Sequence, residues 1–266
     1  MPEVTSLRAA HAVVAPPGRP YVEDPAILEF YRDLLLPFGR EVDEQVLRAA
    51  PQVDHCQLVD ELVAQSDLGA EPDLVIIAQA LPDVVPFVAI GPYLDRKLGG
   101  KATTFGIHHQ GLAAAFTALR AVLAYQQSAR SRLAVVAVLE QTTLPTRFPL
   151  VHDNKLVDSG VLLVFGPGGG LQVDEVASVP SDRVGDLVAK DPDGTLLVTG
   201  PWAPDVAGAA PHHHRTGIGS YCTSVWLELA GNWASWQRHY ATILLCDKDP
   251  RTGDTQLAVL RSEEGR

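Results

Sequence analysis

Continuous apolar runs alternate with amphipathic stretches along the middle of the chain. Runs rich in β-branched residues are typical of strands covered on both faces, and three such runs are Leu74–Ala78, Leu133–Leu139 and Val161–Phe165. Between the first two, apolar residues recur at helical spacing and form one buried stripe: Leu112, Ala115, Phe116, Leu119, Val122 and Leu123. Strand, helix and strand joined by short links predict a parallel or mixed sheet flanked by helices.

Weaker patterns predict further elements on both sides of this region. Helices are expected at Ala26–Leu36 and Ser224–Gln237. A third helix is expected after Asp54, which caps it, with Leu58, Leu62 and Val63 as its core face. A short fourth helix, Tyr93–Leu98, is opened by Pro92. Expected strands are Ala102–Ile107, Leu196–Thr199, Ala241–Cys246 and Gln256–Leu260. Val206–Arg215 is interpreted as a loop, and apart from one helix the first 50 residues show no readable pattern.

A glycine-rich break at Gly166–Gly170 divides the chain. We place the boundary between two halves there, 1–166 and 171–266, and expect them to pack as one compact unit. The second half is shorter. Its helix and terminal hairpin repeat, in shape, the end of the first half.

Composition excludes several classes of function. The 266 residues are 46% hydrophobic and carry a formal net charge of −11, which argues against nucleic acid or an anionic membrane as partner. There is no apolar run of about 18 residues, and Met1–Pro20 lacks the apolar core of a signal peptide. Three widely spaced cysteines without a CxxC pair fit a reducing cytoplasm. We therefore expect a cytoplasmic protein without a disulfide framework.

Five segments, taken in order, resemble ketosynthase III and related thiolase-like enzymes. They are PDLVIIAQALPDVVP (Pro72–Pro86), LGGKATTFGIHHQGLAAAFTAL (Leu98–Leu119), VDSGVLLVF (Val157–Phe165) and, more weakly, TGIGSYCTSVWLELAGNW with HYATILLCDKDPRTGDTQLAVL near the end. The resemblance implies an α/β fold of thiolase-like mixed sheets with layered helices and a reduced C-terminal half.

The departures from the family pattern bear on activity. The family places a reactive cysteine at the start of the buried helix, where the positive helix end lowers the thiol pKa and backbone N–H groups stabilise the oxyanion. Here that position is Leu112, or Gly111 or Ala113 after a shift of one residue. The family's asparagine before the last helix has no counterpart in Thr216–Thr223, and the segment for its catalytic histidine is largely missing. The resemblance therefore implies that ordinary condensation is lost.

Four residues remain candidates for a relocated catalytic site. His108 and His109 precede the nucleophile turn and suit a general base or hydrogen-bond donor, or else a structural histidine and a dimer contact. Cys222, near the start of the last helix, is either a replacement nucleophile or a small buried hydrophobe. His214 is a candidate displaced base, and Gln110 and Leu112 are expected to line the pocket.

Other features favour structural interpretations. His212, His213 and His214 are adjacent and cannot all face one metal ion, so a solvated loop is expected and no metal site. Asp247–Asp254 is interpreted as a hairpin turn, because Pro250 and Ala258 do not fit a calcium loop. The remaining cysteines, Cys56 and Cys246, are expected in the core. Trp226, Trp233 and Trp236 share one helix face, which favours packing or a subunit interface.

Two main functional hypotheses follow. A third hypothesis is that the chain is a degenerate protein that binds no thioester ligand. The first is a non-condensing partner subunit of polyketide, fatty-acid-like or other natural-product biosynthesis, similar to a chain-length factor, with no permanently bound cofactor. It would pair through Thr103–Ile107 as a homodimer or with an active ketosynthase, and acyl carrier protein is a further candidate partner. The second is an acyltransferase, hydrolase or amide-forming enzyme that uses coenzyme A or phosphopantetheine thioesters through His109, His214 or Cys222.

Overall fold

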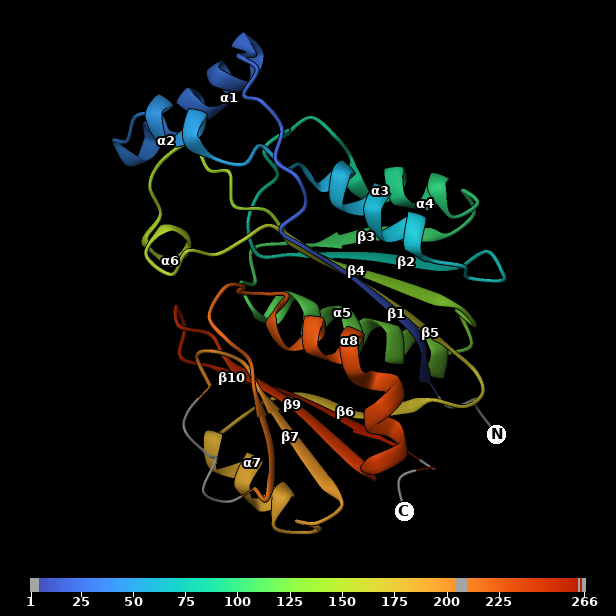
Figure 1. Ribbon diagram of the computed structural model, residues 1–266. Helices are drawn as coiled ribbons and strands as arrows, with labels where there is room; N and C mark the ends of the chain where they lie inside the picture. The colour runs from blue at the N-terminus through green and yellow to red at the C-terminus, as the bar shows by residue number, and fades with distance from the viewer. Residues whose placement is uncertain (1–4, 204–209, 263, 265–266) are drawn as a thin grey trace.

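The computed structural model describes residues 5–203, 210–262 and 264, and a ten-stranded sheet runs through them (Figure 1). The strands are β1 (Ser6–Val14), β2 (Leu74–Gln79), β3 (Thr103–Ile107), β4 (Ala134–Glu140), β5 (Ser159–Gly166), β6 (Leu171–Val179), β7 (Thr195–Thr199), β8 (His212–Arg215), β9 (Thr242–Lys248) and β10 (Thr255–Arg261). The α-helices are α1 (Pro25–Leu35), α2 (Glu44–Ala49), α3 (His55–Gln65), α4 (Ile90–Lys97), α5 (Ala113–Gln127), α6 (Pro149–His152), α7 (Ser181–Val188) and α8 (Ser224–His239), and a short 3₁₀ helix covers Leu36–Phe38.

The strand order shows that the two halves have the same topology. The order is β3-β2-β4-β5-β1-β6-β10-β9-β7-β8, which reads as one five-strand pattern followed by its reverse. In the first half β2 is parallel to β3 and β4, and in the second half β7 is parallel to β8 and β9. Each half ends in an antiparallel pair, β4 with β5 and β9 with β10. The fold is therefore duplicated.

The helices α5 and α8 occupy equivalent places in the two halves and lie side by side between the two groups of strands (Figure 1). Their contact is aromatic: the rings of Phe116 and Trp226 lie 4.9 Å apart between centroids, and both side chains are buried. The main hydrophobic cluster continues from Leu7 in β1 to Leu260 in β10. One core therefore spans both halves, as a layered α/β fold requires.

Two smaller clusters cover the outer faces of the sheet. The helices α3 and α4 pack on the first half through Leu58, Leu62 and Leu94, which explains why β2 and β4 are apolar on both faces. The helix α7 covers the second half through Val184 and Val188. Among the described helices, none has the length and hydrophobicity needed to cross a lipid bilayer.

The predicted mixed α/β fold is confirmed, and each expected helix and strand is present with shifts at the ends. The elements that were not expected are the central strand β1, the strand β6, the helices α2, α6 and α7 and the short 3₁₀ helix. The interpretation of Val206–Arg215 as a loop was wrong at its end, because His212–Arg215 forms β8 and pairs with β7. Residues 204–209 lie outside the described part of the chain.

We predict that Phe116→Ala lowers the free energy of unfolding by about 3–5 kcal/mol, because it empties the contact between α5 and α8. Urea denaturation monitored by circular dichroism measures this loss. Phe38→Ala is the matched control, since Phe38 is 75% exposed and its truncation should change stability little. Equal losses in both variants would contradict the proposed importance of the aromatic contact.

Candidate functional site

The start of α5 is closed by side chains from the second half of the chain. Leu112, the residue before this helix, is 1% exposed, and its backbone N–H donates to Oδ2 of Asp249 at 3.1 Å. The hydroxyl of Tyr221 donates to the same oxygen at 2.7 Å. A free helix start offers N–H groups and a positive dipole end to an anion. Here an internal carboxylate already occupies that place.

Gly111 makes this closure possible. Its φ of +56° lies in the left-handed region, and a Cβ at this position would collide with the Asp249 carboxylate and the Tyr221 hydroxyl. The glycine therefore supplies both the turn and the space for the two polar groups. The turn also holds His109 at a φ of +62°, an uncommon conformation for a residue with a side chain.

At the start of α8 the two halves exchange roles, because a carboxyl group of the first half accepts backbone N–H groups of the second half. Glu140, at the end of β4, accepts the backbone N–H groups of Tyr221 and Cys222. Burial raises the pKa of this carboxyl to about 7. The hydroxyl of Ser224 donates to Oδ2 of Asp247 at 3.0 Å, and burial raises the pKa of Asp247 to about 7 as well. Each half thus places buried carboxyl groups at a central helix.

Cys222 does not have the environment that was expected for a nucleophile. Its side chain is 1% exposed, and its thiol donates to the carbonyl of Leu139 at 3.6 Å. Burial and the neighbouring Glu140 raise the thiol pKa well above its ordinary value. A helix start can lower a thiol pKa, but here burial is the largest cause of the raised pKa, and Glu140 accepts the N–H groups of that start. Cys246 is fully buried in β9, as expected for the core, and burial raises its pKa to about 12.

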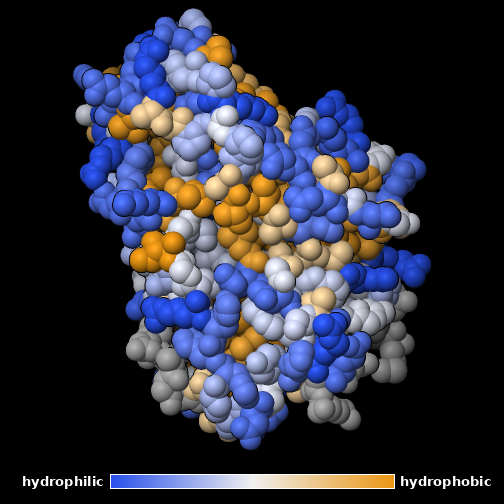
Figure 2. Space-filling view, in the orientation of Figure 1, coloured by the Kyte–Doolittle hydropathy of each residue, from blue (hydrophilic) through white to orange (hydrophobic). Residues whose placement is uncertain are grey.

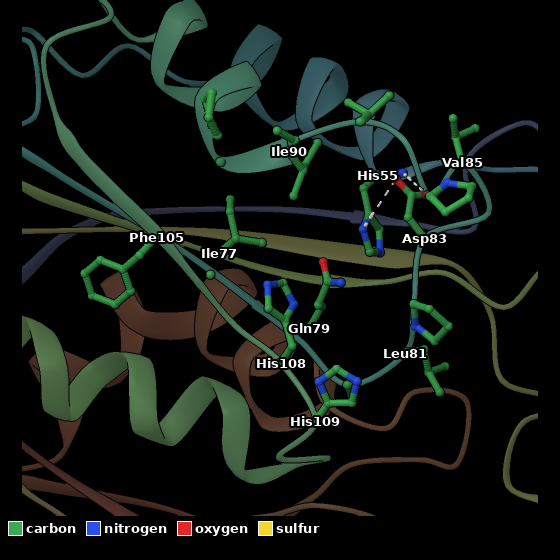
Figure 3. Close-up of a pocket in the computed structure, with 18 of the residues that line it drawn as sticks. His55, Ile77, Gln79, Leu81, Asp83, Val85, Ile90, Phe105, His108 and His109 are labelled. Carbon is green, nitrogen blue, oxygen red and sulfur yellow. Dashed lines mark hydrogen bonds and ion pairs between the residues drawn. The ribbon is translucent and has the colours of Figure 1, made fainter. Parts of the chain in front are cut away.

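An open cavity lies in the first half of the chain, beside the end of β3. It has a volume of about 580 Å³ and is lined by the end of β2, the loop that follows, the start of α4, the end of β3 and part of α1. Figure 3 shows that His108 and His109 reach it from the end of β3. The ring of His108 lies against the backbone of Gly106, where any Cβ would displace it. Partial burial and the neighbouring His109 lower the pKa of His108.

The other candidates lie elsewhere. Gln110 and Leu112 are not among the residues that line this cavity, since Gln110 accepts a hydrogen bond from Thr117 outside it and Leu112 is buried in the main core. His214 lies in β8 and contacts Glu228 on α8, with Nε2 and Oε2 2.8 Å apart. The solvated loop expected for the three histidines was wrong, because all three are half-buried in a paired strand. The cavity therefore brings together His108 and His109 without His214 or Cys222.

Sequence reasoning missed the buried polar residues of both regions. Glu140 and Asp247 lie at the ends of the apolar strands β4 and β9, and Asp249 follows β9, so a carboxylate at the end of a buried strand was the available signal. In the cavity the missed residues are His55 and Asp83. No group of three or more metal-ligating side chains occurs within the described ranges.

Comparison with known proteins identifies the fold. No protein-family model matches the chain, and no curated protein sequence matches it. Solved structures do match over nearly the whole length. AbyA1, a tetronic acid condensing enzyme, superposes with a TM-score of 0.64 at 14% identity and covers 97% of this chain and 100% of its own.

Two further structures agree with this match. The 3-oxoacyl-(acyl carrier protein) synthase III FabH from Pseudomonas aeruginosa PAO1 has a TM-score of 0.63 at 13% identity, with 97% of this chain and 98% of that chain covered. A variant of OleA from Xanthomonas campestris, with bound lauric acid and lauroyl-CoA, has a TM-score of 0.62 at 11% identity, with 98% and 100% covered. This chain therefore has the thiolase-like fold of ketosynthase III-type proteins, as its motifs predicted. It carries Leu112 at the turn where the resemblance places a cysteine.

We predict that Gly111→Ala destabilises the protein by about 2 kcal/mol more than Gly69→Ala. Both glycines have a positive φ, which costs alanine about 1 kcal/mol. Only Gly111 faces Asp249 and Tyr221, and displacing a buried carboxylate from its donors adds to the cost. Chemical denaturation of the two variants measures the difference, and equal losses would show that the closure contributes nothing.

We predict that Glu140→Gln reduces the loss of stability that accompanies rising pH. The folded-state pKa of about 7 lies above the ordinary value of 4.5, so protonation of Glu140 favours the folded state. This contribution is complete below pH 4.5 and is lost as the pH rises through about 7. The free energy of unfolding measured across this range should therefore fall less steeply in Glu140→Gln than in the unchanged protein. Exposed Glu41→Gln, the control, should keep the original slope.

Proposed function

We propose that this chain is a non-condensing, thiolase-fold partner subunit of a cytoplasmic pathway for natural products or fatty-acid-like molecules. The observation that carries the proposal is the closed start of α5. An acyl-transfer site of this type needs a nucleophile and free N–H donors for the oxyanion. At this helix start the side chain is aliphatic, and the N–H of Leu112 is bound by Asp249.

The closure is built into the core, which supports the proposed loss of condensation. Asp249 and Tyr221 come from the second half and are buried, at 2% and 0% exposure. A cysteine at position 112 alone would leave both in place. Recovering a condensing site would therefore require changes in both halves of the chain.

Features at the surface support a partner. Among the described strands β3 is at one edge of the sheet, so its outer edge is available to a second chain. Exposed apolar side chains occur on and after α1 and in the loop after β2: Phe30, Leu34, Leu36, Phe38, Phe87 and Val88. Figure 2 shows hydrophobic residues gathered across the middle of the face that it draws. We propose pairing through β3, as a homodimer or with an active ketosynthase.

The ligands implied by this role are substrates of the pathway. The similar structures include a synthase named for acyl carrier protein and an OleA variant with bound lauroyl-CoA. For this chain we propose no permanently bound cofactor, and acyl carrier protein as a further partner. The net charge of −11 supports a role without nucleic acid or anionic membrane.

A second candidate is an acyltransferase-type enzyme with a relocated site, and the open cavity beside His108 and His109 is the observation that favours it. A neutral histidine there is a suitable general base for transfer or hydrolysis of a coenzyme A or phosphopantetheine thioester. The cavity offers no cysteine, since Cys222 is buried elsewhere. We rank this candidate second because it lacks an activated nucleophile.

We predict no covalent acyl adduct after incubation of the protein with acyl-CoA or acyl carrier protein thioesters. The physical reason is that the Cys222 thiol is buried and its pKa is raised, and that Leu112 is inert. Intact-mass spectrometry measures the adduct, with an active ketosynthase III as positive control. Leu112→Cys should also remain unmodified, because Asp249 and Tyr221 still close the helix start.

The same samples separate the two candidates. Native mass spectrometry should show a dimer or a complex with a ketosynthase, and the complex should change the length of the products. An adduct on Cys222 would overturn the partner-subunit proposal. Thioester turnover that is lost in His108→Ala or His109→Ala would establish the enzyme in its place.

A further inference from the structure

The open cavity beside β3 presents an apolar surface with two histidines at one side. Its volume of about 580 Å³ lies within the usual range for small-molecule sites. Aromatic and branched aliphatic side chains make up much of the lining, among them Phe30, Leu34, Ile77, Ile90 and Phe105. His108 and His109 are exposed and reach the same space from the end of β3 (Figure 3). An apolar body with one polar group matches this distribution.

Several other polar atoms around the cavity are buried beneath its surface. They are both ring nitrogens of His55, Oε1 of Gln79 and Oδ2 of Asp83. The other oxygen of Asp83 accepts the backbone N–H of His55 at 3.1 Å, and the backbone N–H groups of Val84 and Val85 also donate to this carboxyl group. Its side chain is only 10% exposed. The carboxylate therefore belongs to the protein framework and is not available to a ligand in the open space.

The cavity has no accessible permanent charge. No lysine or arginine is among the described residues that line it. Partial burial and the neighbouring His109 lower the pKa of His108 from its ordinary value, so this ring is neutral at pH 7. Moving an ammonium or a carboxylate from water into such a site costs free energy that no counter-ion returns. Burial raises the pKa of Asp83 to about 6, so its ionised carboxyl group would also repel a ligand carboxylate at pH 7.

The two exposed histidines are spaced so that one hydroxyl group can bind to both. Their ring centroids lie 6.5 Å apart, and neither ring has a hydrogen bond within the described residues. An oxygen at hydrogen-bond length from one nitrogen of each ring lies about 4 Å from each centroid, so rings up to about 8 Å apart can share it. A neutral imidazole has one donor and one acceptor nitrogen, and a hydroxyl group both donates and accepts.

We propose that this cavity binds an uncharged aromatic molecule with a hydroxyl group, which lies between His108 and His109. An aromatic body is favoured because Phe30 and Phe105 line the cavity, and aromatic rings gain from offset or edge-to-face contacts with each other. The inference goes beyond the partner-subunit proposal and does not depend on it, because binding at the two histidines requires neither a nucleophile nor a second chain.

Titration calorimetry at pH 7 with four probes that share a phenylbutyl body tests the proposal. The probes are 4-phenylbutanol, its methyl ether, 4-phenylbutylamine and 4-phenylbutanoate. The alcohol should bind most tightly, and the ether, which cannot donate a hydrogen bond, should bind about fivefold more weakly. The amine and the carboxylate should bind about tenfold or more weakly than the alcohol, because each loses the hydration of its charge. Equal binding of alcohol and ether, tighter binding of either charged probe, or no binding of the alcohol would overturn the proposal.

Variants locate the site. His108→Phe keeps a ring but removes its nitrogens, and it should weaken the alcohol about fivefold, to the level of the ether, while leaving the ether unchanged. His109→Asn tolerates the positive φ, withdraws the polar group from the shared position and should have the same effect. His239→Phe, on the exposed end of α8, is the matched control and should change nothing.

A steric variant separates this cavity from binding elsewhere on the surface. Leu34→Trp adds volume at the lining and should weaken the alcohol and the ether together. Circular dichroism verifies that each variant folds. An unchanged affinity for the alcohol in either folded histidine variant, or in folded Leu34→Trp, would place the hydroxyl outside this cavity and contradict the proposal.

Discussion

The structure depends on carboxyl groups that the two halves place at each other's central helices. Asp249 of the second half accepts the N–H before α5, and Glu140 of the first half accepts the N–H groups before α8. Buried helix starts require such partners, because their N–H groups have no acceptor within the helix. These reciprocal hydrogen bonds join the two halves at the centre of one continuous core. It also removes free donors from the position where a thiolase-like nucleophile would act.

The same contacts therefore stabilise the core and close the start of α5. Gly111 leaves room for Asp249 and Tyr221, and Leu112 completes the apolar surroundings. The open space of the molecule lies instead on the outer side of β3, where His108 and His109 reach the cavity. A chain of this fold can thus keep a binding cavity after its central site has been filled.

The sequence was sufficient for elements whose environment is local. The strands β2 and β4 are apolar on both faces because helices cover them, and α5 shows its buried stripe directly. The strand β1 was missed because Arg8 and His11 interrupt its apolar pattern, and its place is determined by pairing with the distant β5. His212–Arg215 was missed for the same reason, since only its pairing with β7 makes it a strand.

The central site was less predictable because its contacts join residues far apart in sequence. Asp249 and Leu112 are separated by 137 positions, and nothing in a hairpin turn indicates that one aspartate faces the core. One oxygen of Asp249 receives a hydroxyl from Tyr221 and a backbone N–H from Leu112. A fold tolerates a buried carboxylate when its charge is compensated. The two donors to Asp249 come from different halves of the chain, so its compensation becomes visible only when the fold brings Leu112 and Tyr221 together.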